Sequence, residues 1–175
     1  KMNRASLLTI VVPCYNEEEV LFETSSRLKD ILANLIYRNL INDRSKILFV
    51  DDGSTDKTWK IITELHQMDK IFCGLQLSRN QGHQNALLAG LMEAKEYSDC
   101  IISMDVDLQD DVSVIDQFIT KFHEGSDIVY GIRESRKKDS FMKKQTALIF
   151  YKLLIQLGVN IKYNHADYRL MSQRT

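Results

Sequence analysis

The sequence contains few of the residues that mark several common protein classes. Its 175 residues include one proline, seven glycines and three cysteines, which are Cys14, Cys73 and Cys100. The cysteines are too far apart for a metal-binding spacing, so we expect buried free thiols in a reducing compartment. The sequence has no stretch of about 18 uncharged apolar residues and no apolar core of a secretory signal. The net charge of -1 argues against bulk binding of nucleic acid.

The scarcity of glycine also argues against one large enzyme class. After the first predicted strand, a dinucleotide-binding enzyme needs closely spaced glycines so that its backbone can approach a pyrophosphate. The turn at this place is Pro13-Cys14-Tyr15-Asn16-Glu17-Glu18 and contains none. Because Pro13 lacks the N–H that a central strand uses, we expect the strand to end there. The turn therefore argues against a nicotinamide or flavin enzyme.

The chain does contain a regular alternation of short apolar runs and longer amphipathic segments. Strands are predicted at residues 7–12, 46–50, 72–77, 100–104 and 127–132, and helices at residues 18–40, 57–68, 84–97 and 114–122. This repeated order of strand and helix predicts a mostly parallel α/β sheet flanked by helices. Right-handed crossovers then bring the carboxyl ends of the parallel strands to one edge. Hydrophobic residues make up 44% of the chain, enough for the core of a single domain over residues 1–175.

Acidic residues gather where these strands are predicted to end. Asp105 and Asp107 follow the fourth strand, and Asp51 and Asp52 follow the second. Ligands of open α/β sheets bind at this edge, where two carboxylates and an oxygen of Gln109 could hold a hard cation and, through it, a diphosphate. Without a cation the acids would repel one another. Each motif also has a plainer explanation, because Asp-x-Asp is common in polar loops and Asp51-Asp52 could form a turn or cap a helix.

Other residues near the strand ends are possible partners of a nucleotide. Asp51 or Asp52 could accept hydrogen bonds from a base or ribose, and Arg133, after the fifth strand, could approach the phosphates. A surface charge is the alternative for Arg133. From the residues alone, His83 and Asp167 are ordinary polar loop residues.

The segment from Phe141 to Val159 differs from the earlier helices because its apolar face is much wider. Such a face needs a partner, which could be the core of the domain, another subunit or a membrane surface. Basic residues lie before and at the start of this segment and could form a solvated loop or hold an anionic headgroup. They are Arg136, Lys137, Lys138, Lys143 and Lys144.

Five motifs occur in order over nearly the whole chain. They are Thr9–Glu18, Val50–Asp56, Leu77–His83, Asp105–Asp110 and Ala166–Met171. With these motifs the sequence resembles family 2 glycosyltransferases of the GT-A fold, a Rossmann-like α/β fold of nucleotide-diphospho-sugar transferases. Within that family it is most similar to the branch of dolichyl-phosphate mannose synthases and bacterial polyprenyl-phosphate glucosyltransferases. One departure is Asp111-Val112, where the family usually has prolines after its acidic loop.

The resemblance implies a role for each matching residue. Asp105 and Asp107 correspond to the metal-binding acids and Gln109 to a further ligand, so Mg²⁺ or Mn²⁺ is the expected cofactor. Asp167 corresponds to an aspartate that acts as a base or orients the acceptor, and Arg169 beside it is the second predicted catalytic residue. The predicted nucleotide-binding positions are Pro13, Tyr15, Glu17, Asp51, Asp52, Arg79, Gly82 and Arg133.

The implied function is inverting transfer of a hexose from a nucleotide diphosphate sugar, with UDP-glucose favoured, to a polyprenyl phosphate. Because that acceptor is already anionic, positioning and charge neutralisation should matter more than a strong base. We expect the reaction on the cytoplasmic side of a membrane. Related members of this branch continue into membrane helices and this chain ends first, so we also expect it to be a catalytic domain cut before C-terminal membrane helices. A homo-oligomer is possible.

Three alternatives remain open. The acceptor could be a sugar hydroxyl of a growing polysaccharide, in which case Asp167 would have to be a true base. Receiver-type regulatory modules also cluster acids at sheet ends, but their acid pair follows the first strand rather than the second. Haloacid-type phosphatases use Asp-x-Asp on the first strand, whereas Asp105 follows the fourth.

Overall fold

The computed structural model describes residues 5–107, 111–132 and 165–175 of the chain. Internal contacts divide the chain into two compact units, Lys1–Val129 together with Asp167–Thr175, and Tyr130–Ala166. The predictions for Gln109, Arg133, the five basic residues and the apolar segment 141–159 lie outside the described residues. A single domain over the whole chain stays a prediction. Within the described ranges, no helix has both the length and the apolar character needed to cross a bilayer.

Six strands form one sheet at the centre of the fold. They are β1 (Leu8–Cys14), β2 (Lys46–Asp51), β3 (Phe72–Gln76), β4 (Cys100–Ser103), β5 (Ile128–Ile132) and β6 (His165–Ser172). Their order in the sheet is β3-β2-β1-β4-β6-β5. β1 is parallel to β2 and β4, β2 is parallel to β3, and β6 runs antiparallel to β4. The predicted mostly parallel sheet is confirmed.

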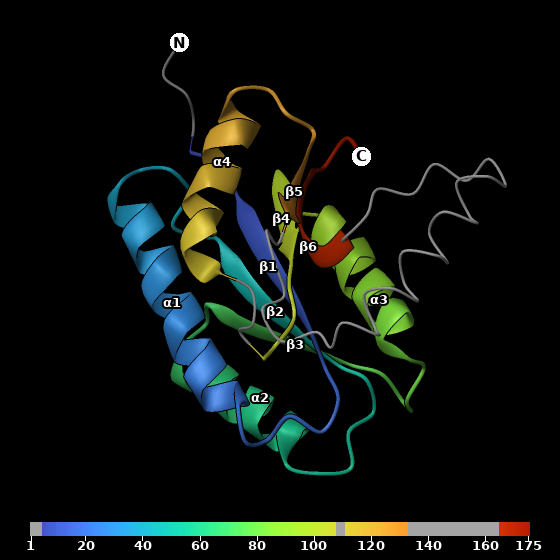
Figure 1. Ribbon diagram of the computed structural model, residues 1–175. Helices are drawn as coiled ribbons and strands as arrows, with labels where there is room; N and C mark the ends of the chain where they lie inside the picture. The colour runs from blue at the N-terminus through green and yellow to red at the C-terminus, as the bar shows by residue number, and fades with distance from the viewer. Residues whose placement is uncertain (1–4, 108–110, 133–164) are drawn as a thin grey trace, which may run out of the picture. The chain divides into compact units, whose positions relative to one another are not determined.

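Helices cover both faces of this sheet. They are α1 (Leu21–Tyr37), α2 (Thr58–Met68), α3 (His83–Lys95) and α4 (Ile115–His123), and a 3-10 turn, η1 (Val112–Val114), precedes the last. Figure 1 shows α1 and α4 on one side of the sheet and α3 on the other. All four helices begin and end within a few residues of the predicted bounds.

β1 is buried along its whole length, as expected for a parallel strand covered on both faces. It continues past its predicted end, because Pro13 still pairs with β2. Alternate residues of β1 bond to opposite neighbours: the carbonyl of Cys14 accepts from the β2 side, and the carbonyl of Val11 accepts from the β4 side. The position of the missing N–H of Pro13 therefore faces the β4 side, where β4 has already ended. For this reason a proline is tolerated in the central strand.

α3 approaches the sheet closely because it carries a glycine at the contact. A Cβ atom on Gly90 would lie 2.5 Å from Cγ1 of Val11 and 2.6 Å from Cγ2 of Val50, which is closer than carbon atoms pack. Both valines and Ile101 belong to the buried core beneath the helix. This packing places the N-terminal end of α3, at His83, near the edge where the parallel strands end.

The sequence alone predicts a loop around Asp167, and this prediction is wrong. The residue belongs to β6, in which Arg169 is the register partner of Ser103 in β4. Tyr168 is buried, and its ring packs against Phe118 of α4 with 4.8 Å between the ring centroids. The burial of alternate side chains therefore makes this segment a strand, although charged residues lie between them.

Candidate functional site

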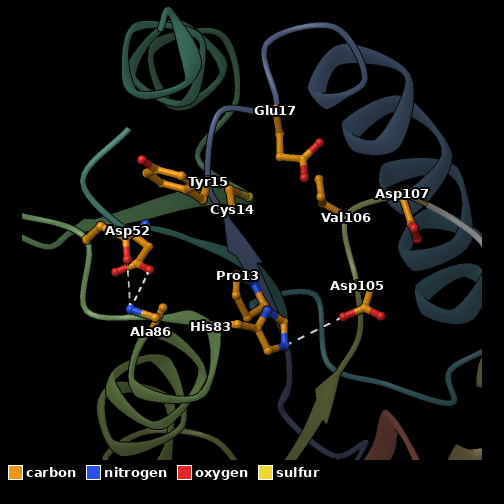
Figure 2. A pocket seen from close by; sticks show the side chains of 12 residues that line it. Pro13, Cys14, Tyr15, Glu17, Asp52, His83, Ala86, Asp105, Val106 and Asp107 are labelled. Atoms are coloured by element: carbon orange, nitrogen blue, oxygen red, sulfur yellow. Dashed lines mark hydrogen bonds and ion pairs between the residues drawn. The ribbon is translucent and has the colours of Figure 1, made fainter. Parts of the chain in front are cut away.

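A cavity of about 300 Å³ opens at the carboxyl edge of the parallel strands (Figure 2). Its walls come from the end of β1 and from the segments that follow β1, β2, β3 and β4. These four strands are distant in sequence and adjacent in the sheet. The predicted site residues that line it are Pro13, Tyr15, Glu17, Asp52, Gly82, Asp105 and Asp107. The lining is completed by Cys14, Asn80, His83, Ala86 and Val106.

The loops after β1 and β2 hold each other through reciprocal hydrogen bonds. The backbone N–H of Asn16 donates to Ser54 Oγ at 3.0 Å, and the N–H of Thr55 donates to Asn16 Oδ1 at 2.9 Å. The N–H of Glu17 donates to Thr58 Oγ1 at 2.8 Å. Asn16 has a φ of 55°, a left-handed conformation that asparagine adopts more readily than most residues. The two loops therefore form one wall of the cavity.

Asp52 joins this wall to the loop before α3. Its Oδ1 accepts a hydrogen bond from the N–H of Gln81 at 2.7 Å, its Oδ2 accepts one from the N–H of Gly82 at 2.9 Å, and the residue is 2% exposed. Next to it, Gly53 has a φ of 68°, and a Cβ atom there would lie 2.4 Å from the carbonyl carbon of Arg79. The turn after β2 is thus packed directly against the loop after β3, with no room for a side chain at Gly53.

Asp51 and Arg79 are not part of the cavity lining. The Asp51 carboxylate is fully buried and accepts hydrogen bonds from the N–H of Ser54 and from Gln76 Nε2, both at 3.2 Å. Arg79 is exposed. Both carboxylates therefore accept hydrogen bonds that hold turns and loops. This is one of the two roles that the sequence allows for the Asp51-Asp52 pair. Of the pair, Asp52 is the one that lines the cavity.

Glu17, Asp105 and Asp107 bring acidic side chains to the same cavity. Burial raises the pKa of Glu17, and the negative charges of Asp107 and Asp56 raise it further. The side chain of Asp105 is 40% exposed, and its Oδ1 lies 3.7 Å from His83 Nε2. Figure 2 shows these two side chains pointing toward each other. A carboxylate whose ionisation is opposed by the negative charge of Asp107, in an open cavity lined by a further acid, suits a divalent cation.

The described residues include two of the three predicted metal ligands. Among them, no group of three His, Cys, Asp or Glu side chains could hold an ion together. Asp105 and Asp107 are the predicted acidic ligands, and the predicted neutral ligand, Gln109, lies outside the described residues. Mg²⁺ is commonly bound by one or two carboxylates, with substrate phosphates completing its shell. The two acids therefore fit such an ion.

A histidine and a cysteine also line the cavity. His83, which the sequence alone suggests is an ordinary loop residue, is the first residue of α3 and lines the cavity. Its place after the third predicted strand is the signal that could have found it. Burial raises the pKa of the Cys14 thiol well above its ordinary value, and the charges of Glu17 and Asp51 add to this effect. A thiol that stays protonated is a poor nucleophile.

Similarity to known proteins identifies the family. The sequence pattern described as "Glycosyl transferase family 2" matches residues 9–174. The chain belongs to glycosyl transferase family 2. The resemblance that the five motifs indicate is confirmed, and family 2 membership replaces the receiver and phosphatase alternatives.

Curated family 2 relatives share about a third to more than half of the residues. The uncharacterised glycosyltransferase YkoT of Bacillus subtilis is 57% identical over 169 residues, which are 97% of this chain and 50% of that protein. The bactoprenol glucosyl transferase of Shigella phage SfV is 36% identical over 170 residues, which are 95% of this chain and 52% of that protein. The chain therefore spans about half the length of the curated relatives it matches.

A solved structure with the same fold is glucosyl-3-phosphoglycerate synthase from Mycobacterium tuberculosis, in complex with Mn²⁺, UDP and phosphoglyceric acid. The TM-score is 0.62 at 18% sequence identity, over 97% of this chain and 56% of that one. At this identity the likeness establishes the fold, and the predicted GT-A fold of family 2 is confirmed.

The two residues that the family 2 motifs predict to be catalytic, Asp167 and Arg169, belong to β6. The register partner of Arg169 is Ser103, the last residue of β4, so its backbone stands beside the strand that leads to Asp105. The Nε atom of Arg169 is buried and has no hydrogen-bond partner in the described part of the chain. β6 therefore carries a basic residue beside the last residue of β4.

Proposed function

We propose that this family 2 protein transfers a hexose from a nucleotide diphosphate sugar to a polyprenyl phosphate, with inversion at the anomeric carbon. One observation carries the proposal: the acidic cavity lies on a chain that is 36% identical over 170 residues to a bactoprenol glucosyl transferase. UDP-glucose is the favoured donor. Because the chain spans about half of that relative, the acceptor and the membrane location belong to the proposal.

The donor nucleotide is proposed to lie along the wall formed by the loops after β1 and β2. The Tyr15 side chain is 44% exposed at this wall, so its ring offers a face on which a base can stack. The Asp52 carboxylate is already bonded to two backbone N–H groups, and its proposed role is to shape the pocket for base and ribose. The other predicted nucleotide-binding positions stay proposals: Pro13, Glu17, Asp51, Arg79, Gly82 and Arg133.

Asp105 and Asp107, together with Gln109, would hold Mg²⁺ or Mn²⁺. When bound, such an ion offsets the charge that develops on the departing diphosphate. The two acids follow the end of β4, so the sheet would bring the diphosphate near the wall formed by the loops after β1 and β2. His83 borders the proposed position of the ion, since its Nε2 lies 3.7 Å from Oδ1 of Asp105.

The acceptor phosphate supplies its own nucleophile. One of its oxygens attacks the anomeric carbon, a carbon–oxygen bond forms as the bond to the diphosphate breaks, and the nucleoside diphosphate leaves with the bonding electrons. Asp167 would orient the acceptor or take a residual proton. The basic side chain of Arg169 would favour an anionic acceptor on the β6 side. Because the acceptor is already ionised near neutral pH, the reaction needs no strong base.

A polyprenyl acceptor puts the reaction at a lipid surface, and we propose the cytoplasmic side of a membrane. The basic residues around the start of the apolar segment would be attracted to anionic headgroups there. These residues are Arg136, Lys137, Lys138, Lys143 and Lys144. A homo-oligomer stays a prediction.

Two measurements test the proposal. Calorimetric titration with UDP and with GDP, each with and without Mn²⁺, should show metal-dependent binding and a preference for UDP. Turnover of UDP-glucose by the full-length enzyme should be faster with a polyprenyl phosphate than with a sugar acceptor. A failure to bind either nucleotide under both conditions would count against a transferase. A preference for the sugar acceptor would instead favour polysaccharide synthesis.

A further inference from the structure

Thr24 makes a hydrogen bond that links α1 to the loop after β4, which carries Asp105 and Asp107 and is called the acidic loop below. It lies near the start of the helix and is 1% exposed, and its Oγ1 donates to the backbone carbonyl of Val106 at 2.6 Å. Val106 stands between Asp105 and Asp107 and is itself buried. A buried hydroxyl from another element therefore holds the backbone between the two acids.

Two other helical threonines, Thr63 and Thr120, use their hydroxyls differently. Thr63 donates to the carbonyl of Trp59 and Thr120 to that of Asp116, each four residues earlier in its own helix. This is a common local bond for threonine in a helix. Thr24 instead directs its hydroxyl away from α1, to a residue 82 positions later in the chain. The bond thus serves the loop rather than the helix.

The acidic loop needs such a hold because the sheet ends before the acids. β4 ends at Ser103, and the N–H of Met104 makes a further bond to the carbonyl of Val11 at 3.2 Å. The bond from Thr24 then fixes the carbonyl at Val106. Since peptide units are planar, fixing this carbonyl restricts the backbone rotations between Asp105 and Asp107, and so the relative directions of their carboxylates.

We propose that Thr24 is a positioning residue of the metal site, which holds Asp105 and Asp107, through the Val106 carbonyl, in the arrangement that one divalent cation requires. The proposal rests on the proposed function, in which these acids bind Mg²⁺ or Mn²⁺. Groups outside the ligand shell commonly act in this way, by orienting ligands without touching the ion.

Three substitutions separate positioning from packing. Thr24→Val keeps the shape of the side chain and removes the donor, which leaves a buried carbonyl without its partner. Thr24→Ser keeps the donor and removes a methyl group. Ser25→Ala is the matched control, because Ser25 is 2% exposed on the same helix and its hydroxyl bonds within α1, to the carbonyl of Phe22 at 2.8 Å.

The probes are Mn²⁺ in the presence of UDP, followed by electron paramagnetic resonance, and UDP without metal, followed by calorimetry. Thr24→Val should weaken Mn²⁺ binding by about 10–100-fold, as other outer-shell changes do, and leave metal-free UDP binding unchanged. Thr24→Ser should bind Mn²⁺ nearly as well as the wild type. Ser25→Ala should lower the melting temperature without changing Mn²⁺ affinity.

Wild-type Mn²⁺ affinity in Thr24→Val would overturn the proposal, and so would equal losses in Thr24→Val and Thr24→Ser or in Thr24→Val and Ser25→Ala. If Thr24→Val does not fold, Thr24→Ala removes the same donor with less bulk, and failure of both to fold would mark Thr24 as a core residue only. Absence of UDP-dependent Mn²⁺ binding in the wild type would overturn the proposed function together with this inference. Normal wild-type binding with an unaffected Thr24→Val would overturn the positioning role alone.

Discussion

The Oδ2 atom of Asp52 accepts a hydrogen bond of 2.9 Å from the backbone N–H of Gly82. Together with the bond from Gln81 to Oδ1, this contact fastens the turn after β2 to the start of α3. Asp52 is therefore a structural link between two walls of the cavity as well as part of its lining. Its replacement should affect both stability and binding.

Asp52→Asn should destabilise the fold by about 1.5–3 kcal/mol, the usual contribution of hydrogen bonds to a charged group. An amide offers one acceptor oxygen to the two N–H donors, so one bond is lost. Urea unfolding measures the change, and UDP affinity should fall because the wall loosens. Asp43→Asn is the matched control: Asp43 is exposed, and the change should alter the free energy of unfolding by less than about 0.5 kcal/mol. Similar losses in both variants would contradict the link.

Asp105→Asn combined with Asp107→Asn should weaken Mn²⁺-dependent UDP binding by more than the roughly 10–100-fold that outer-shell changes cost. Both predicted acidic ligands are then gone, while the melting temperature should stay near that of the wild type because neither side chain is in the core. Calorimetry and thermal melting measure the two effects. Asp30→Asn combined with Asp43→Asn removes two exposed acids and controls for the lost charge. Unchanged metal dependence in the first variant would remove these acids from the site.

Glu17 should make the folded protein less stable as the pH rises. Its pKa in the folded state is raised above the ordinary value of 4.5, by burial first and then by Asp107 and Asp56. Between the unfolded and folded pKa values the folded state holds the proton more tightly, so stability is greatest below the unfolded pKa and falls as the pH rises toward the folded pKa.

Glu17→Gln removes this dependence. Its melting temperature should match that of the wild type below the unfolded pKa of Glu17, exceed it by a margin that grows as the pH rises from there, and keep a constant margin above the folded pKa. Glu19→Gln, at an exposed neighbouring position, should show no such trend. A margin that stays constant over the whole pH range would be the contrary result.

Gly53→Ala should cost about 2–5 kcal/mol, the sum of a left-handed backbone and overpacking against Arg79. Gly125→Ala separates the two contributions, because Gly125 has a φ of 103° but no atom lies within 4 Å of the place that its Cβ would take. That variant should lose only the backbone contribution, about 1–2 kcal/mol. Urea unfolding compares them, and equal losses would mean that the Arg79 loop moves aside without cost.

The convergence of Asp52, Asp105 and Asp107 follows from the sequence, because the strands that precede them are parallel and their ends share an edge. The different surroundings of Asp51 and Asp52 do not. Both residues belong to the same motif, and the register of β2 and the place of Gln76 on β3 bury one carboxylate while the other lines the cavity. Both positions are aspartate, so the residue types do not predict that difference.

Local sequence patterns predict neither β6 nor the hydrogen bond of Thr24. The alternation around Tyr168 and Leu170 is short and interrupted by charge, and its partner strand lies far earlier in the chain. Similarly, nothing near Thr24 in the sequence distinguishes it from Thr63, which bonds within its own helix. Both features depend on contacts between distant segments, which periodicity does not encode.

β4 gains its antiparallel neighbour only from residues 169–172, long after its own residues in the chain. During synthesis, the ribosome therefore releases the loops after β1 and β2 well before the strand that carries Arg169. Until that strand arrives, β4 presents an open edge to which other nascent chains can pair, and closure across so long a separation is slow. Those two loops can thus come together early in translation, whereas β6 pairs with β4 only later.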